Sequence, residues 1–127
     1  MAAAKAVSEW VNGLAGKFGT DRILILGDMN AWRSSDPIKI FRNKGFTELV
    51  EQLAGLPQYS YVYWGEAGTL DYAFASDALL PTVNHAEIWH INSAWPQKME
   101  LPDPWLRSSD HDPVVVDLDF SQPGTSD

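Results

Sequence analysis

The continuous apolar run Ile23-Leu24-Ile25-Leu26 ends abruptly in Gly27-Asp28-Met29-Asn30. Such a run suits a strand that is buried on both faces of a sheet. Asp28 and Asn30 are separated by one residue, so an extended backbone would aim both side chains to the same side. There they could hold a water, a metal or a phosphate oxygen. Equally, they could satisfy their own backbone in an Asx-type turn.

Two later segments also place a carboxylate beside a hydrophobic run, namely Gly68-Thr69-Leu70-Asp71 and Asp110-His111-Asp112-Pro113. Asp71 lies inside a strand-like run, where a buried carboxylate is unfavourable unless it is paired. A histidine partner would relieve that cost and would select one tautomer of the imidazole. The alternative for Asp71 is a solvent-facing position on an edge strand.

Asp110 and His111 are neighbours, so in an extended chain their side chains point in opposite directions. They therefore suit separate tasks: Asp110 could ligate a hard cation such as Mg²⁺, while His111 faces a reacting phosphate. The alternative is a turn before the following strand, with His111 half exposed. His85 and His90 lie in or near another predicted strand, and structural packing is the simpler interpretation of both.

Hydrophobic periodicity and turn residues predict a layered α/β arrangement with a mixed sheet. Helices are expected at residues 3–18, where Val7, Trp10, Val11, Leu14 and Phe18 share helical spacing, at 37–44 with Asp36 as N-cap, and at 47–53. Strands are expected at residues 23–26, at 59–64 and 69–75 as a hairpin around a turn at 65–68, at 83–91 and at 113–120. Residues 96–104 contain three prolines and indicate a loop.

The length of 127 residues and the 45% hydrophobic content suit one domain, which we place at residues 1–120, with a frayed tail at 121–127. The sequence has no cysteine. No apolar run approaches the roughly 20 residues that span a bilayer, so we expect no membrane partner. The first seven residues lack the charged-then-apolar order of a signal peptide.

The formal net charge of −8 argues against non-specific affinity for nucleic acids, because that affinity depends on lysine and arginine contacts to phosphates. It leaves a phosphodiester substrate open, since a carboxylate-rich site presents positive charge once a divalent cation is bound. Arg33, Lys39, Arg42 and Lys44 form one basic stretch. This stretch could meet a phosphate backbone or could be the solvated face of a helix.

Taken in order, the segments at residues 23–30 (ILILGDMN), 68–76 (GTLDYAFAS) and 107–116 (RSSDHDPVVV) resemble the endonuclease/exonuclease/phosphatase superfamily, and within it the bacterial extracellular nucleases. Residues 59–63 and 86–92 support the resemblance. It implies the C-terminal half of a DNase I-like four-layer α/β sandwich, with a mixed β-sheet flanked by helices. It also implies an extracellular or periplasmic, Mg²⁺-dependent nuclease acting on DNA or RNA, with Mn²⁺ or Ca²⁺ as alternative ions.

The resemblance assigns catalytic roles by position. Asp28 matches the residue that orients or deprotonates the attacking water, or assists the leaving oxygen, and Asn30 matches the one that helps to hold the phosphate. Asp71 matches the carboxylate bonded to the catalytic histidine, here His111. Asp110 matches an acidic residue of the metal environment. In such a site the cation polarises a phosphoryl oxygen while the His–Asp pair stabilises developing negative charge.

The chain departs from the family pattern in two respects. Tyr72 stands where related nucleases often have histidine, which would alter packing or substrate contact. The earlier half of the sandwich, which normally supplies the principal metal-binding glutamate, has no match, because Glu9 and Asn12 lie on a predicted helix rather than at a strand end. We therefore expect the isolated chain to bind Mg²⁺ poorly, to hydrolyse little, and to self-associate through an uncovered apolar sheet face.

Two other functions fit the same motifs. One is a phosphodiesterase of the same superfamily that acts on a phospholipid or an inositol phosphate, which the shared motifs cannot separate from a nuclease. The other is an interaction module that keeps the fold without catalysis. The complete set of Asp28, Asn30, Asp71, Asp110 and His111 argues against that module.

Overall fold

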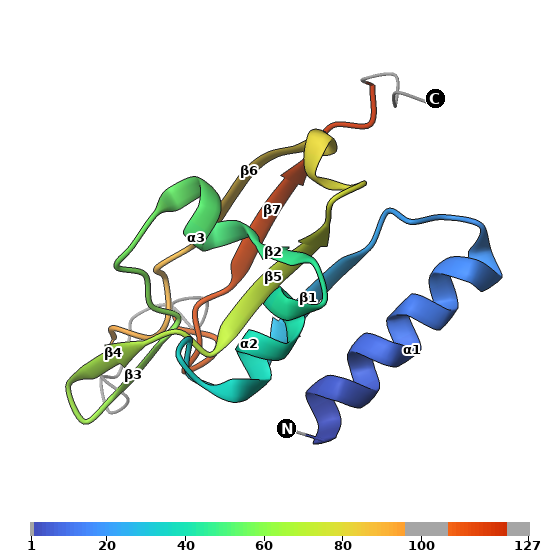
Figure 1. The fold of residues 1–127 in the computed structure, drawn as a ribbon. Helices are drawn as coiled ribbons and strands as arrows, with labels where there is room; N and C mark the ends of the chain where they lie inside the picture. Colours follow the sequence, from blue (N-terminus) through green and yellow to red (C-terminus); the bar gives the residue numbers. More distant parts are fainter. Residues whose placement is uncertain (1, 96–106, 122–127) are drawn as a thin grey trace.

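The computed structural model describes residues 2–95 and 107–121 (Figure 1). Its helices are α1 (Ala2–Phe18), α2 (Asp36–Asn43) and α3 (Leu49–Ala54), with a short 3₁₀ turn η1 (Leu80–Thr82). Its strands are β1 (Leu24–Asp28), β2 (Phe46–Glu48), β3 (Tyr61–Tyr63), β4 (Glu66–Gly68), β5 (Asp71–Ser76), β6 (Val83–Ile88) and β7 (Val114–Leu118). Within these described residues, none of the helices combines the length and apolar character needed to span a membrane.

Strand β5 is the centre of the fold. Hydrogen bonds join it to β1 on one side and to β2 on the other, both antiparallel, while β6 and β7 form a separate antiparallel pair. β7 runs beside β5 in the same direction (Figure 1), so the strands have the mixed directions that the sequence predicts. In the β1–β5 register Asp28 lies opposite Asp71, which brings two predicted site residues to one end of the sheet.

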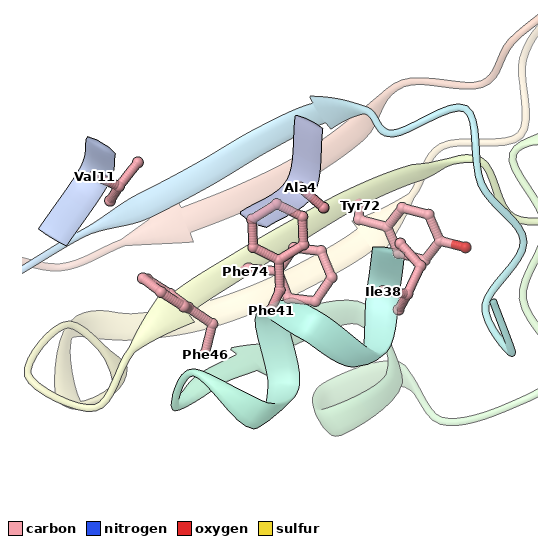
Figure 2. Packing of buried hydrophobic residues seen from close by; sticks show 7 residues of the cluster. All are labelled: Ala4, Val11, Ile38, Phe41, Phe46, Tyr72 and Phe74. Atoms are coloured by element: carbon pink, nitrogen blue, oxygen red, sulfur yellow. The ribbon is translucent and has the colours of Figure 1, made fainter. Parts of the chain in front are cut away.

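Helices α1 and α2 cover one face of β5. Tyr72 and Phe74 are two residues apart and share this face, and the Phe74 ring lies 5.1 Å from that of Phe41 on α2. The buried side chains of this cluster are Ala4, Val11, Ile38, Phe41, Phe46, Tyr72 and Phe74 (Figure 2). Burial of each large side chain contributes roughly 1.5–3 kcal/mol, so this cluster holds both helices on the sheet.

A second buried cluster joins the other residues of β5 to α3 and to the β6–β7 pair. Its members are Leu49, Val50, Ala73, Ala75, Leu79, Ala86 and Ile88, with Val114 and Val116 packed against it. Residues 72–75 of β5 are therefore fully buried. The strand that is enclosed on both faces is thus β5.

The expectation that the apolar run at residues 23–26 is buried on both faces is wrong. β1 ends the three-stranded order β1-β5-β2, and alternate residues along it are exposed. Ile25 packs against the cluster under α1, whereas Leu24 and Leu26 point away from it and are 37% and 52% exposed. The face of β1 that carries Leu24 and Leu26 is therefore exposed. An apolar run in the sequence does not distinguish such an edge strand from a central strand that is covered on both faces.

The expected hairpin is shorter than the sequence predicts. β3 pairs with β4, which occupies the segment that was expected to be the turn, and the chain reverses at Trp64 and Gly65. Both of these residues have positive φ, 50° and 82°. β5 is therefore free to pair with β1 and β2 instead of with β3.

Several element boundaries also differ from prediction. The N-cap of α2 is Ser35, and Asp36 is the first residue of the helix. The helix expected at residues 47–53 is replaced by β2 followed by α3, because the Glu48 carboxylate caps α3 by accepting from the backbone N–H groups of Val50 and Glu51. The loop expected at residues 96–104 and most of the expected tail, residues 122–127, lie outside the described residues.

Helix α1 occupies the expected segment, but its buried residues match the predicted apolar stripe only at Val11. Ala4, Ser8 and Val11 are buried, at the spacing of one helical stripe. Trp10 and Phe18 of the predicted apolar stripe are instead 65% and 68% exposed. The small side chains bring α1 close to α2, and the large ones stay at the surface.

Candidate active site

The structure brings Asp28, Asp71 and His111 together at one end of the sheet. Asp28 and Asp71 lie opposite each other at the paired ends of β1 and β5. His111 precedes β7 and forms an isolated antiparallel bridge with Tyr61. One ligand atom from each of Asp28, Asp71 and His111 lies within 4.8 Å of the other two. Three segments that are far apart in the sequence therefore form a single site.

His111 and Asp71 form a hydrogen-bonded pair. The Nδ1 atom of His111 lies 2.7 Å from Oδ2 of Asp71. Burial alone would lower the pKa of the His111 imidazole, but the hydrogen bond to Asp71 and the charges of Asp71, Asp28 and Asp110 outweigh it and raise the pKa above its usual value. With Nδ1 held by Asp71, Nε2 is the nitrogen that remains for a substrate oxygen.

Ser60 orients the Asp71 carboxylate through a hydrogen bond. The sequence did not predict Ser60 as a site residue. It is fully buried, and its hydroxyl donates to Oδ2 of Asp71 at 2.7 Å. The Ser60 hydroxyl oxygen in turn accepts from the backbone N–H groups of Leu70 and Asp71 at 3.0 and 3.1 Å. Because both N–H groups point at the Ser60 oxygen, its proton is directed to Asp71. The carboxylate therefore has two donors on one oxygen, Ser60 and His111.

Asp28 and Asn30 combine the two interpretations that the sequence left open. The backbone N–H of Asn30 donates to Oδ1 of Asp28 at 2.7 Å, which is an Asx-type turn, and Asn30 has φ 49°. Both residues are exposed and line a cleft of about 330 Å³. The other residues lining this cleft are Trp32, Tyr61, Tyr63, Leu70 and His111. The turn thus satisfies the backbone and still presents both residues to the cleft.

Asp110 is exposed and lies outside the group formed by Asp28, Asp71 and His111. Its charge contributes to the raised pKa of His111, so it lies near enough to act electrostatically. Its assignment as a metal ligand stays a prediction.

Asp112 is the buried carboxylate of this segment, and it was not predicted. Its Oδ1 accepts from the backbone N–H groups of Asn92 and Ser93, both at 2.8 Å, and its Oδ2 accepts from the Ser93 hydroxyl at 2.5 Å. Burial would raise the pKa of Asp112, but the bonds from Ser93, Asn92 and His90 outweigh it and lower the pKa. The charged carboxylate of Asp112 thereby links the segment that carries His111 to the loop after β6.

His90 takes part in the same network, whereas His85 does not. Nδ1 of His90 lies 3.1 Å from Oδ2 of Asp112, and its ring stacks on Tyr59 with the centroids 4.1 Å apart. The Asn92 amide donates to the backbone carbonyl of His111 at 2.9 Å. His85 is exposed and faces Glu87 at 3.4 Å. His90 therefore has a packing role. Its contacts with Asp112 and Tyr59 support the segment next to His111.

The basic stretch is partly neutralised. Arg33 binds the carboxylates of Glu48 and Glu51, and Arg42 also binds Glu51. The Arg33 guanidinium lies 5.7 Å from the centre of the Tyr72 ring. Lys39 pairs loosely with Asp36 at 3.7 Å. Arg33 and Arg42 thus serve structural ion pairs, and only Lys39 and Lys44 fit the solvated helix face.

Tyr72, the departure from the family pattern, is a packing residue. Its side chain is fully buried, and its hydroxyl lies 2.8 Å from the backbone carbonyls of Ala31 and Thr69. Burial raises the pKa of the Tyr72 phenol, so it stays neutral. The hydroxyl ties the loop after β1 to the start of β5, next to the site.

The oxygen atoms at this site suit a divalent cation. Carboxylates are preferred by Mg²⁺ and Ca²⁺, and Mg²⁺ is commonly held by one or two of them together with waters and a substrate phosphate. Asp28 is the exposed carboxylate of the group, whereas Oδ2 of Asp71 is already shared by Ser60 and His111. Asp28 and the remaining oxygen of Asp71 could therefore hold such a cation.

One end of this layered α/β fold thus combines a His–Asp pair, a second carboxylate and an asparagine. The chain belongs to the Endonuclease/Exonuclease/phosphatase family, whose model matches residues 5–111. Members of this family hydrolyse phosphodiester bonds. No curated protein matches the chain.

Two solved structures share the fold. One is a 3′ phosphatase, NExo, from Neisseria bound to a product DNA hairpin, with 17% identity and a TM-score of 0.66 over 92% of this chain. The other is the endonuclease domain of TRAS1, a telomere-specific non-LTR retrotransposon, with 18% identity and a TM-score of 0.58 over 93% of this chain. This chain covers 52% of each of them, so it spans about half of their length. The likeness confirms the DNase I-like fold.

Proposed function

We propose that this chain is the C-terminal part of a Mg²⁺-dependent nuclease that hydrolyses phosphodiester bonds of DNA or RNA. The observation that supports it best is the meeting of Asp28, Asp71 and His111, with the 2.7 Å His111–Asp71 bond at its centre. Both structural neighbours act on or bind nucleic acid by their descriptions, which favours this substrate over a phospholipid or an inositol phosphate.

The geometry supports the roles that we propose for these residues. His111, held through Nδ1 by Asp71, presents Nε2 to a phosphate oxygen and, when protonated, stabilises the negative charge that develops there. Asp28 is exposed in the cleft and can orient or deprotonate the attacking water. The Asn30 amide can donate to a phosphate oxygen. A bound Mg²⁺, or Mn²⁺ or Ca²⁺ in its place, would neutralise phosphate charge beside Asp28.

The other half of the sandwich would complete the site. Glu9 of α1 does not take the place of the metal-binding glutamate, because it is exposed beside Lys5 and lies outside the acidic group at the site. Asn12 is an exposed residue of the same helix. We propose that the preceding half of the domain provides the principal metal-binding glutamate and covers Leu24 and Leu26. Without it, this chain should be nearly inactive and should self-associate through that face.

An extracellular or periplasmic location is part of the same proposal. It is supported by the resemblance to bacterial extracellular nucleases and by nothing else in the chain. Detection of the protein in the culture medium or the periplasmic fraction of its source would test it.

The decisive experiment restores the preceding half of the domain and measures release of acid-soluble nucleotides with Mg²⁺ and with a chelator. We expect cation-dependent release that His111→Ala lowers by about 10²–10⁴-fold. His85→Ala is the matched control, because His85 is exposed and outside the cleft.

Full activity of the His111→Ala protein would contradict the mechanism. Turnover of lipid phosphodiesters without release of nucleotides would assign the second superfamily activity. If a completed domain shows no hydrolysis, the non-catalytic module is the better interpretation.

A further inference from the structure

The cleft beside His111 has aromatic walls. Trp32, Tyr61 and Tyr63 line it together with Asp28, Asn30, Leu70 and His111. Trp32 and Tyr63 are 49% and 59% exposed, and Trp64, at the tip of the same hairpin, is 88% exposed. We call Trp32, Tyr61, Tyr63 and Trp64 the aromatic strip. It begins at the catalytic histidine and leads away along β3.

The tyrosines form an ordered ladder. Tyr61 and Tyr63 are two residues apart on β3 and so share one face. Their ring centroids are 6.3 Å apart with an interplanar angle of 12°, and the Tyr61 ring lies 4.8 Å from that of His111. Near-parallel rings beside the catalytic group offer flat surfaces at successive distances from the reacting phosphate.

Gly68 makes room for the indole of Trp32. Gly68 lies opposite Tyr61 in the β3–β4 pair, so a side chain there would share the face of Tyr61. A Cβ on Gly68 would lie 2.2 Å from Cζ3 of Trp32. The indole therefore occupies the place of the absent side chain and lies against the hairpin beside Tyr61. Because Gly68 has no side chain, Trp32, which lies in the loop after β1, can pack beside Tyr61.

Trp64 is exposed at the tip of the hairpin. Its φ of 50° is in the left-handed region, which is unfavourable for a bulky side chain. It belongs to neither buried cluster, and its one aromatic contact among the described residues is edge-on with Tyr63 at 6.2 Å. This exposed indole adjoins Tyr63, which lines the cleft, and is therefore available to contact a ligand there.

We propose that the aromatic strip stacks the bases of an unpaired DNA or RNA strand while one of its phosphates lies at Asp28 and His111. The nature of this ligand rests on the proposed function. Aromatic rings stack on any base, but only unpaired strands expose base faces freely. The net charge of −8 and the engagement of Arg33 and Arg42 by glutamates leave little positive charge for phosphate contacts. Stacking is then the main source of affinity.

The test uses the full chain and three labelled probes: a single strand, its duplex, and a strand of the same length in which every base is removed. We expect the single strand to bind at least tenfold more tightly than the baseless strand and than the duplex. Trp32→Ala and Tyr63→Ala should each weaken single-strand binding about tenfold, the size of one lost stacking contact. Trp10→Ala, which removes an exposed tryptophan of α1, should leave it unchanged.

A second pair of variants separates position from composition. Gly68→Ala keeps every aromatic residue but displaces Trp32, so it should weaken single-strand binding as Trp32→Ala does. Gly13→Ala is its control, because an added Cβ at Gly13 meets nothing within 4 Å. Thermal unfolding of each variant checks that it folds. Equal binding of the single and baseless strands, or no binding of either, overturns the proposal.

Hydrolysis of a simple aryl phosphodiester by the completed domain reports the proposed function independently. Turnover together with base-independent binding would support the proposed nuclease function and would contradict base stacking on the aromatic strip. Base-dependent binding without turnover would support the strip and remove the hydrolytic function.

Discussion

His111 and Asp71 are 40 residues apart in sequence and are joined by a 2.7 Å hydrogen bond between Nδ1 and Oδ2. Asp71 is held in turn by Ser60, whose hydroxyl has its acceptor sites filled by two backbone N–H groups. The imidazole orientation is therefore set by a chain of contacts that begins in the buried backbone. Such support is what keeps a catalytic histidine in one tautomer without a bound substrate.

Asp71→Asn should lower the pKa of His111. In the native chain burial opposes protonation, and the bond and charge of Asp71 more than offset it. Because the folded pKa is raised, protonation of His111 stabilises the fold fully below the unfolded value of about 6.5, and this contribution is lost as pH rises through the higher folded value.

NMR titration of the histidine ring in the presence of a chelator would measure this shift, with His85 as the internal reference. Asp77→Asn, which changes an exposed carboxylate outside the β6–β7 pair, is the matched control and should leave the His111 pKa unchanged. An unaltered His111 pKa in Asp71→Asn would show that Asp71 does not control the imidazole.

Asp112→Ala should destabilise the fold by about 3 kcal/mol, because it removes charge-assisted bonds and leaves the buried N–H groups of Asn92 and Ser93 without an acceptor. The folded pKa of Asp112 is lowered, so the carboxylate stabilises the fold above its unfolded pKa of about 3.9. This contribution is lost as pH falls through the still lower folded value.

Urea unfolding of Asp112→Ala and of the native chain across the acid range would measure both effects. Asp117→Ala removes an exposed carboxylate of β7 and should change stability by less than about 0.5 kcal/mol. Equal stabilities of the two variants would show that the Asp112 network is not required for folding.

The polar ends of β1 and β5 were predictable because each places a carboxylate directly beside an apolar run in the sequence. The cost of burying Asp71 alone indicated a histidine partner, and the family resemblance implied that this partner is His111. Ser60 and Asp112 gave no such signal. A serine between two tyrosines and an acid before a proline are ordinary in sequence, and their partners, Asp71 and Ser93, lie 11 and 19 residues away.

The fold was predictable at the level of element type and order, and less so for burial. Leu24 and Leu26 have the same local pattern as a doubly buried strand, but whether they are covered depends on the layer that packs on β1. The hairpin partner of β3 was likewise decided by β5, which forms hydrogen bonds with both β1 and β2. These outcomes are set by tertiary competition, which a local pattern does not contain.

Tyr72→Phe should destabilise the fold by about 1 kcal/mol while leaving the ring packing intact. The variant removes the hydroxyl that donates to the backbone carbonyl oxygens of Ala31 and Thr69. These carbonyl oxygens then lose a hydrogen-bond donor. Tyr63→Phe is the matched control, because that ring is 59% exposed. Chemical denaturation would compare them, and an unchanged midpoint for Tyr72→Phe would mean that the hydroxyl is replaced by another donor.

The isolated chain should self-associate through the open face of β1. Leu24 and Leu26 point away from α1, and β1 is the edge of its sheet, so both an apolar surface and free backbone groups are available. Leu26→Lys should shift the chain toward monomer in sedimentation experiments at micromolar concentration, because it places a charge in the contact. Leu53→Lys, at a residue of α3 that is 48% exposed, is the control and should leave the association unchanged. A native chain that sediments as a monomer at that concentration would show that the face is tolerated in water.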